Sequence, residues 1–550
     1  MTARPRPAPR RAFTLVEMLV AMVLTLILVA AIAEFYAYVG ETVKDGRAMI
    51  EMSGSLRTAV QRLKTDLDLL TLPVAPWTDD GGGVLIPGVV DANSNPLFPA
   101  TLTPIGSGAG GYFEIYEGIC SDCDVNGNGT VDLSDTAADW LKPGVTNLLG
   151  DGDDFIAMTI RAGSEPLTGR LVATNTPPII RAQHAEVIWW VGFDDLNGNG
   201  VWNLDEPRQI YRRQLLICPN HPQIGLIAEY TPANASNLLA AQQFLRTYWQ
   251  SNDISASIRQ ETSQNGTTYW RIRPNSLADL SRRERRFAHS GFNTNATDSF
   301  PYPQQLYPTL VSGALSAASP NVGYLPGVNT SYVQQLMGRG EDIVLTNILA
   351  LDVQVYDQGA ILLADTDQSN LGSLSATDAV SALAPGDPGY LAAMSASPIY
   401  PRVGRGAYVD LGYGQKLINL LSNAPYNNAT AAATVANVYN IQPPALFGVP
   451  NYNQLGFTYD TWSLSYERDG LNQDWLADNG PMSNINQAPF DEGTDGLDND
   501  GINGVDDVGE RETQPPFSRP LRGIQITIRV YEPGTRQMRQ ATVKADFINE

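Results

Sequence analysis

The first 39 residues constrain the fold of this chain more than any other part. Residues 13–39 form an apolar run whose only charged side chains are Glu17 and Glu34, and a leader at residues 1–12, charged only by arginines, precedes it. At about 1.5 Å of rise per residue, the run makes roughly 40 Å of helix, which is enough to cross a bilayer. The basic leader favours a cytoplasmic N-terminus with the remaining chain on the far side.

Glu17 is the residue of this run that needs an explanation. A carboxylate inside the hydrocarbon layer is costly, and such residues are by default functional. A secretory signal peptide has its small-residue cleavage site after the apolar stretch, whereas here Ala12 precedes the stretch. A plain membrane anchor explains the apolar run but not Glu17.

The sequence Phe-Thr-Leu-Val-Glu at residues 13–17, behind a short basic leader, resembles the signal of type IV prepilins and type II secretion pseudopilins. The resemblance implies that a prepilin peptidase cuts between Ala12 and Phe13 and that the new N-terminal Phe13 is methylated. Ala12 departs from the family, which usually has Gly there. The resemblance also makes Glu17 an assembly residue that meets the freed amine of a neighbouring subunit, and an ion pair in low dielectric sets the register between packed helices.

The helix is predicted to continue beyond the membrane. Apolar residues recur at spacings of three and four, which indicates an amphipathic helix that packs on a globular head. Pro73 and Pro76 then end the helix. The stripe consists of Met49, Met52, Leu56, Val60, Leu63, Leu67 and Leu70.

After the helix, short apolar or alternating runs broken by Gly, Pro and Asn predict strands. They lie at 155–161, 186–193, 209–216, 268–273, 343–356, 523–531 and 540–547. The last two flank EPGTRQ, whose Pro and Gly predict a hairpin turn. The expected fold class is α+β, with a long N-terminal helix packed on an antiparallel β-sheet head that carries large loop insertions.

The predicted division of the chain follows from these patterns. It comprises a prepilin leader at 1–12, a transmembrane and assembly helix at 13–39, its amphipathic continuation at 40–72, a pseudopilin-like β head with calcium loops at 73–364, an insertion at 365–520 and a C-terminal hairpin of the head at 521–550.

Several stretches resemble the J-type minor pseudopilins (general secretion pathway protein J, PilW-like): LRTAVQRLKTDLDLL, EVIWWVGF, RQIYRRQLL, GEDIVLTNILALDVQVYD and the C-terminal hairpin. This resemblance implies a non-catalytic protein of the inner membrane, with a periplasmic head, that helps to initiate or cap a type II secretion pseudopilus. Its partners would be other minor and major pseudopilins and the inner-membrane assembly platform. The alternative is a minor type IV pilin with a calcium-dependent adhesive head.

Two segments match the EF-hand calcium loop, in which oxygen ligands alternate around an invariant glycine. The first has its ligand positions at Asp124, Asn126, Asn128, Thr130, Asp132 and Asp135, and the second at Asp195, Asn197, Asn199, Val201, Asn203 and Glu206. The second loop joins two predicted strands, so the expected role is structural calcium at a hairpin. Metal-free Asx-rich turns are the alternative. A third, less complete candidate comprises Asp498, Asp500, Asp506 and Asp507.

The cysteines allow two arrangements. Cys120, Cys123, Cys218 and His221 together supply a Cys₃His zinc set. The compartment inferred from the leader is oxidising, where a disulfide with one thiol left over is favoured over zinc.

The composition weighs against other classes of function. Asp+Glu 58 against Lys+Arg 36 gives a net charge of −22, which repels nucleic acid. The one locally basic stretch, SRRERRF at 281–287, is interpreted as a solvated face or as a neutraliser of nearby acids. The sequence contains no Walker A, GxSxG or HExxH motif, so no enzymatic activity is expected.

Overall fold

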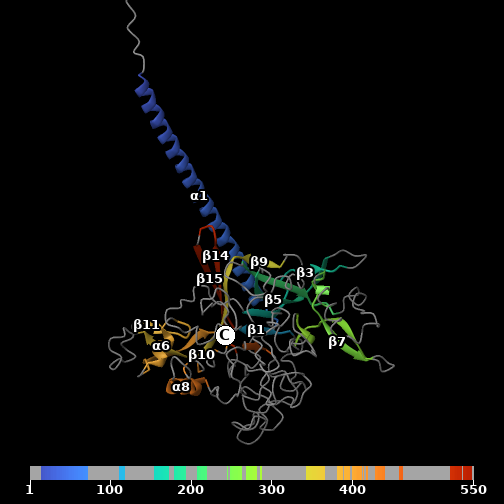
Figure 1. Ribbon diagram of the computed structural model, residues 1–550. Coiled ribbons are helices and arrows are strands. Elements are labelled where there is room, and N and C mark those ends of the chain that lie inside the picture. Colours follow the sequence, from blue (N-terminus) through green and yellow to red (C-terminus); the bar gives the residue numbers. More distant parts are fainter. Residues whose placement is uncertain are drawn as a thin grey trace, which may run out of the picture.

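The computed structural model describes a long helix, its β-sheet head and a second small lobe (Figure 1). The described residues are 14–71, 111–117, 154–172, 179–193, 207–219, 245, 248–249, 251–262, 268–281, 285–287, 342–365, 381–387, 389–396, 399–411, 413, 417–418, 421, 428–439, 457–461, 521–535 and 537–547.

Helix α1 (Leu15–Asp68) has two halves with different surroundings. The first half projects from the head (Figure 1), and its large apolar side chains are exposed as far as Val43. All seven residues of the predicted amphipathic stripe belong to the main hydrophobic core or pack against it, but only six lie on α1, because Leu70 is beyond its end; Ala59 and Leu63 have no exposed surface. The stripe is therefore the face on which the head packs, as its spacing predicts.

The main sheet has six antiparallel strands in the order β13-β1-β2-β5-β6-β9. Their bounds are β1 Phe113–Glu117, β2 Phe155–Arg161, β5 His184–Phe193, β6 Arg208–Leu216, β9 Ile343–Thr346 and β13 Phe457–Asp460. Helix α1 ends at Asp68, four residues before the predicted end at 72, and Leu70 forms an isolated bridge to Ile160 of β2 in place of a further helical turn. Strand β13 lies within the predicted insertion 365–520, yet it pairs with β1 inside this sheet.

The second sheet has five strands: the order is β11-β10-β14-β15, and β12 also pairs with β10. Their bounds are β10 Ile348–Asp365, β11 Ser381–Leu383, β12 Arg402–Val409, β14 Gly523–Glu532 and β15 Gln537–Asp546. The register of β14 and β15 closes at Glu532 opposite Gln537, so the predicted C-terminal hairpin is confirmed. Its apolar face joins the same core as the helix stripe.

Smaller elements surround these two sheets. Hairpins β3–β4 and β7–β8 are separate two-stranded sheets. Their strands are β3 Leu167–Arg170, β4 Ile179–Ala182, β7 Ala256–Thr262 and β8 Thr268–Pro274, and the short helices are η2 Asp279–Ser281, α6 Tyr390–Ser395 and α8 Ala429–Tyr439.

A second lobe is built on the far half of β10. Over residues 348–355 strand β10 pairs with β14, and from Val355 onward it pairs with β12, with register shifts near Asp357. Ile361 and Leu363 of β10 pack with α6 and α8 in a hydrophobic cluster separate from the main core. The continuous strand β10 therefore contributes side chains to both hydrophobic cores.

The expected α+β class is confirmed, because a long N-terminal helix precedes antiparallel sheets. The strand predicted at 343–356 is divided in two by Asn347, the one described non-glycine residue with a left-handed backbone (φ 56°). At this point the chain passes from β9 in the first sheet to β10 in the second. Asn adopts this conformation more readily than most residues.

Candidate assembly site

The exposed half of α1 is the first component of the site. Within the described residues, α1 is the helix that is long and apolar enough to cross a membrane, and none of its most apolar window is buried by the head. Its exposed side chains include Phe35, Tyr36 and Tyr38. Tyrosine is enriched where a membrane meets water, and these rings lie near the end of the apolar run. This half of α1 is suited to lipid or to the apolar helices of other subunits.

Glu17 forms hydrogen bonds within its own helix. The Thr14 backbone N–H donates to Glu17 Oε2 over 2.9 Å, the Thr14 hydroxyl donates to the same oxygen over 3.0 Å, and the Glu17 backbone N–H faces Thr14 Oγ1 at 3.3 Å. This is a capping box, which the Thr-x-x-Glu spacing specifies. Both side-chain contacts fall on one oxygen, so the other carboxylate oxygen stays accessible to a group from outside the helix.

A buried ion pair locks the other end of α1 to the head. Asp66, in the last turn, accepts hydrogen bonds from Arg212 Nε at 2.7 Å and Arg212 Nη2 at 2.8 Å. The indole N–H of Trp189 donates to the same carboxylate over 2.8 Å. The two charged side chains are 4% and 5% exposed. Asp66 therefore fixes the rotation and axial position of α1 on strands β5 and β6.

A second buried charge lies on the opposite face of the main sheet. Arg286 Nη1 donates to Glu114 over 2.8 Å and also to Asp460, and its guanidinium lies 3.9 Å from the centre of the Tyr112 ring. Tyr112 in turn donates to the fully buried Glu186 over 2.7 Å. Burial and the Glu186 charge raise the pKa of Tyr112 well above its ordinary value. This part of SRRERRF is thus a neutraliser of acids, one of its two predicted roles.

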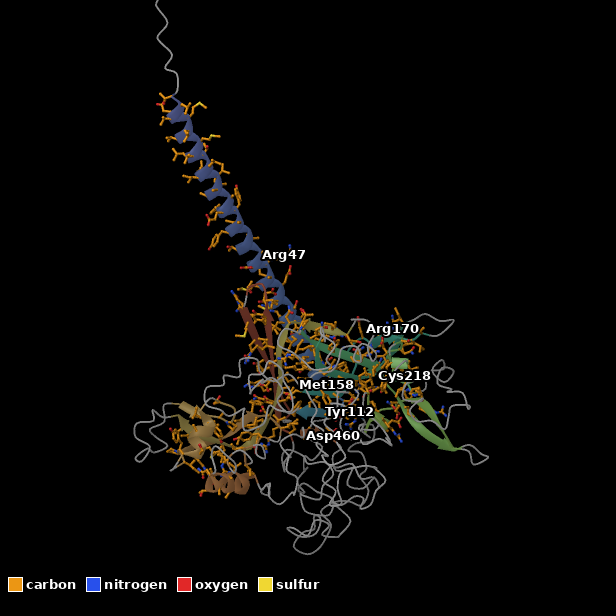
Figure 2. The ribbon with its side chains drawn as sticks, in the orientation of Figure 1. Arg47, Tyr112, Met158, Arg170, Cys218 and Asp460 are labelled. Carbon is orange, nitrogen blue, oxygen red and sulfur yellow. The ribbon has the colours of Figure 1, made fainter. Side chains whose placement is uncertain are left out.

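Arg286 joins segments that are far apart in the chain. Glu114 lies on β1, Asp460 lies on β13, and Arg286 is in the short segment 285–287. The ion pairs explain how β13 is held against β1 at the edge of the sheet. Figure 2 labels Tyr112 and Asp460 close together on the side of the head away from α1. This cluster is a closed structural site, because each of its charged side chains is at most 1% exposed.

Most predicted ligand residues lie outside the described residues. This holds for the processing site, for all three calcium segments and for Cys120, Cys123 and His221. Cys218, just after β6, is a free thiol, and burial raises its pKa to about 11. Within the described residues, no three His, Cys, Asp or Glu side chains are grouped to hold a metal ion. The calcium, zinc and disulfide assignments therefore stay predictions.

Comparison with known proteins identifies the N-terminal segment. The family model of the prokaryotic N-terminal methylation motif matches residues 8–33, which include the predicted processing site and Glu17. No curated protein and no solved structure matches the chain. The motif implies processing by a prepilin peptidase and assembly into pilus-like filaments, and it points to a structural, non-catalytic protein. The motif and the single apolar helix together support a membrane-anchored, type IV pilin-like protein.

Proposed function

We propose that this protein is a minor pseudopilin of a type II secretion system, with a cytoplasmic N-terminus and a periplasmic head, that helps to initiate or cap a pseudopilus. The observation that carries the proposal is the division of α1 into an exposed apolar half with Glu17 near its start and a half buried in the head. Such a helix is anchored in the membrane before assembly and packs against other helices afterwards.

The size of the head favours a terminal position in the filament. Packed helices lie about 8–10 Å apart. The head is broad by comparison, because its second lobe extends to one side of α1 and hairpins β3–β4 and β7–β8 extend to the other (Figure 1). Heads of this breadth crowd one another if they repeat at every position along a bundle of helices. A subunit at the end of a filament has no such neighbour on one side.

The second lobe favours one further candidate function. Its core is separate from the core that holds α1, so the lobe is not needed to position the helix. In a minor type IV pilin, the head would be a calcium-dependent adhesive module, to which the second lobe adds binding surface and in which calcium stiffens the predicted loops. Assembly through α1 is common to both candidates.

Mass spectrometry of the membrane-extracted protein tests the processing step. We expect Phe13 as the N-terminal residue, with one methyl group on its amine. An intact leader, or cleavage beyond residue 30, would contradict a prepilin-type protein.

The role of Glu17 is tested by Glu17→Gln, with Glu34→Gln as the matched control in the same apolar run. Removing either charge eases insertion into the membrane, so both variants should reach wild-type levels there. We expect only Glu17→Gln to be depleted from sheared or cross-linked filaments. Equal incorporation of the two variants would remove the assembly role of Glu17.

A further inference from the structure

Exposed large apolar side chains are few on the head and occur at two places. Outside α1, those among the described residues are Val172 at 59% exposed, Ile179 at 65% and Met538 at 51%. Val172 and Ile179 flank the end of hairpin β3–β4, and Met538 lies near the turn of hairpin β14–β15. These side chains do not pack in the interior of the head, so they contact either water or a partner molecule.

Both hairpins are basic within an acidic protein. Residues 521–547 contain five basic and two acidic side chains, and residues 161–181 contain three basic and one acidic, whereas the whole chain carries −22. Exposed arginines occur in both hairpins: Arg181 shares the outer side of β4 with Ile179, whereas Arg539 follows Met538 on β15 and points to the other face of the strand, toward α1. Apolar side chains combined with arginine are the composition that binds the headgroup layer of a membrane.

The hairpins also lie on the appropriate side of the head. In Figure 1, β14 and β15 lie beside α1 where it leaves the head, and β3 lies at one side of the head, nearer to that point than α8 or β7. Figure 2 places Arg170 of β3 nearer to the side from which α1 emerges than Tyr112 or Asp460. A direct contact fixes the level of β15 on the helix, because Arg539 Nη2 lies 3.3 Å from the sulfur of Met49. Met49 lies ten residues, about 15 Å of helix, beyond the end of the apolar run at Val39.

We propose that the ends of hairpins β14–β15 and β3–β4 dock on anionic phospholipid headgroups of the membrane that α1 crosses. Transmembrane helices commonly tilt by about 20°, and a tilt toward β3 would move hairpin β3–β4 toward the lipid surface. The acidic remainder of the head is repelled by the same surface, so these two basic ends select one orientation. The contact holds the head against the membrane until assembly withdraws the helix. This proposal rests on the membrane anchoring proposed above.

Protection of a sheet edge does not account for this pattern. Edge strands such as β15 often carry charges, above all lysine, that prevent pairing with other chains. Four of the five basic side chains at residues 521–547 are arginines instead. Edge protection also leaves Val172, Ile179 and Met538 unexplained, since apolar residues at an edge promote aggregation.

The test uses the full-length protein reconstituted in lipid nanodiscs of phosphatidylcholine, with or without phosphatidylglycerol. Hydrogen exchange is measured for peptides that cover residues 167–182 and 529–541. We expect slower exchange in both segments with the anionic lipid and a return to the neutral-lipid rate in about 0.5 M salt, where the Debye length is only a few ångströms.

A double variant, Arg181→Gln with Arg539→Gln, is expected to lower occupancy of the docked state by about fivefold per arginine. The matched control is Arg402→Gln with Arg405→Gln on β12, which removes two exposed arginines from the second lobe. The control should leave the protection unchanged.

Three outcomes would overturn the proposal. Exchange at the two hairpins could be the same in both lipids, the control variant could have the same effect as the test variant, or protection could arise only after other filament subunits are added. The last outcome would assign this surface to a neighbouring subunit. In each case, the proposed membrane anchoring stands if the protein still inserts into the nanodisc bilayer. Failure of the protein to insert would refute the anchoring itself.

Discussion

Replacement of Asp66 by alanine is expected to weaken the attachment of α1 to the main sheet by about 3–5 kcal/mol. The carboxylate receives two hydrogen bonds from Arg212, at 2.7 and 2.8 Å, and one from Trp189 at 2.8 Å. Both members of the ion pair are at most 5% exposed. Alanine leaves the guanidinium buried without its counter-charge, which is the costly way to break a buried pair. It also leaves the indole N–H without its acceptor.

Hydrogen exchange in increasing urea measures this effect on the full-length protein in detergent micelles. The head has two cores, so a single unfolding midpoint would combine events that need not be cooperative. Peptides from β5 and β6 report the free energy of opening at the strands that contact Asp66. We expect that free energy to fall in Asp66→Ala, while peptides from α6 and α8 in the second lobe keep wild-type protection.

Two further variants separate the ion pair from general damage to the helix. Glu51→Ala removes the exposed pair with Arg47 on the same helix and should leave the protection of β5 and β6 unchanged. The double variant Asp66→Leu with Arg212→Leu removes both charges and should be less destabilised than Asp66→Ala. A loss below about 1 kcal/mol in Asp66→Ala, or a double variant as damaged as the single one, would refute the role given to this pair.

Three other outcomes are expected. Gly406→Ala should destabilise the second lobe by about 1–2 kcal/mol, because its φ is +100° and a Cβ there would lie 2.4 Å from the Tyr356 hydroxyl. The control is Gly404→Ala, whose Cβ meets only Leu362 at 3.4 Å. An equal loss of stability of the second lobe in the two variants would contradict this reasoning. Cys218 should react with iodoacetamide at pH 8 about a hundredfold more slowly in the folded protein than in urea, because burial raises its pKa from 9.0 to about 11; equal rates would show that the thiol is exposed. Calcium should raise the free energy of opening of β5 and β6, the strands that flank the loop at 195–206, by about 2.7 kcal/mol at a hundredfold excess over Kd, as measured by hydrogen exchange in urea. Glu206→Gln should reduce that gain more than Glu492→Gln, and equal protection with calcium and with chelator would make these loops metal-free turns.

The sequence predicts those parts of the fold whose signal is local. The strand predicted at 155–161 coincides with β2, because it begins with four consecutive apolar residues and all but its last residue are buried. The amphipathic stripe of α1 can be recognised equally well, because residues on one face of a helix recur at spacings of three and four. The capping box could also have been found, since Thr14 and Glu17 have the required separation.

The parts that sequence reasoning missed depend on partners far away in the chain. Strand β13 is four residues long, and Asp460 at its end is paired with Arg286, 174 residues earlier. A strand of this length is too short to show a periodic pattern of apolar residues. The ion pair and the neighbouring strand hold it in place instead. Strand β12 has a different difficulty: Gly404 and Gly406 interrupt the alternation of apolar side chains that identifies a strand. Tertiary pairing with β10 fixes both its position and its conformation.

The position of Asp66 on α1 has a mechanical consequence for assembly. In the proposed assembly, filament growth acts on the exposed half of the helix, whereas the load is the head attached to the other half. A slip of one residue along the axis moves Asp66 by about 1.5 Å and rotates it away from Arg212, which leaves two buried charges poorly paired. The same slip removes Ala59 and Leu63 from the sites where they are fully buried. Slippage is therefore opposed by both the charge and the packing, so that α1 and the main sheet move as one body when the helix leaves the membrane.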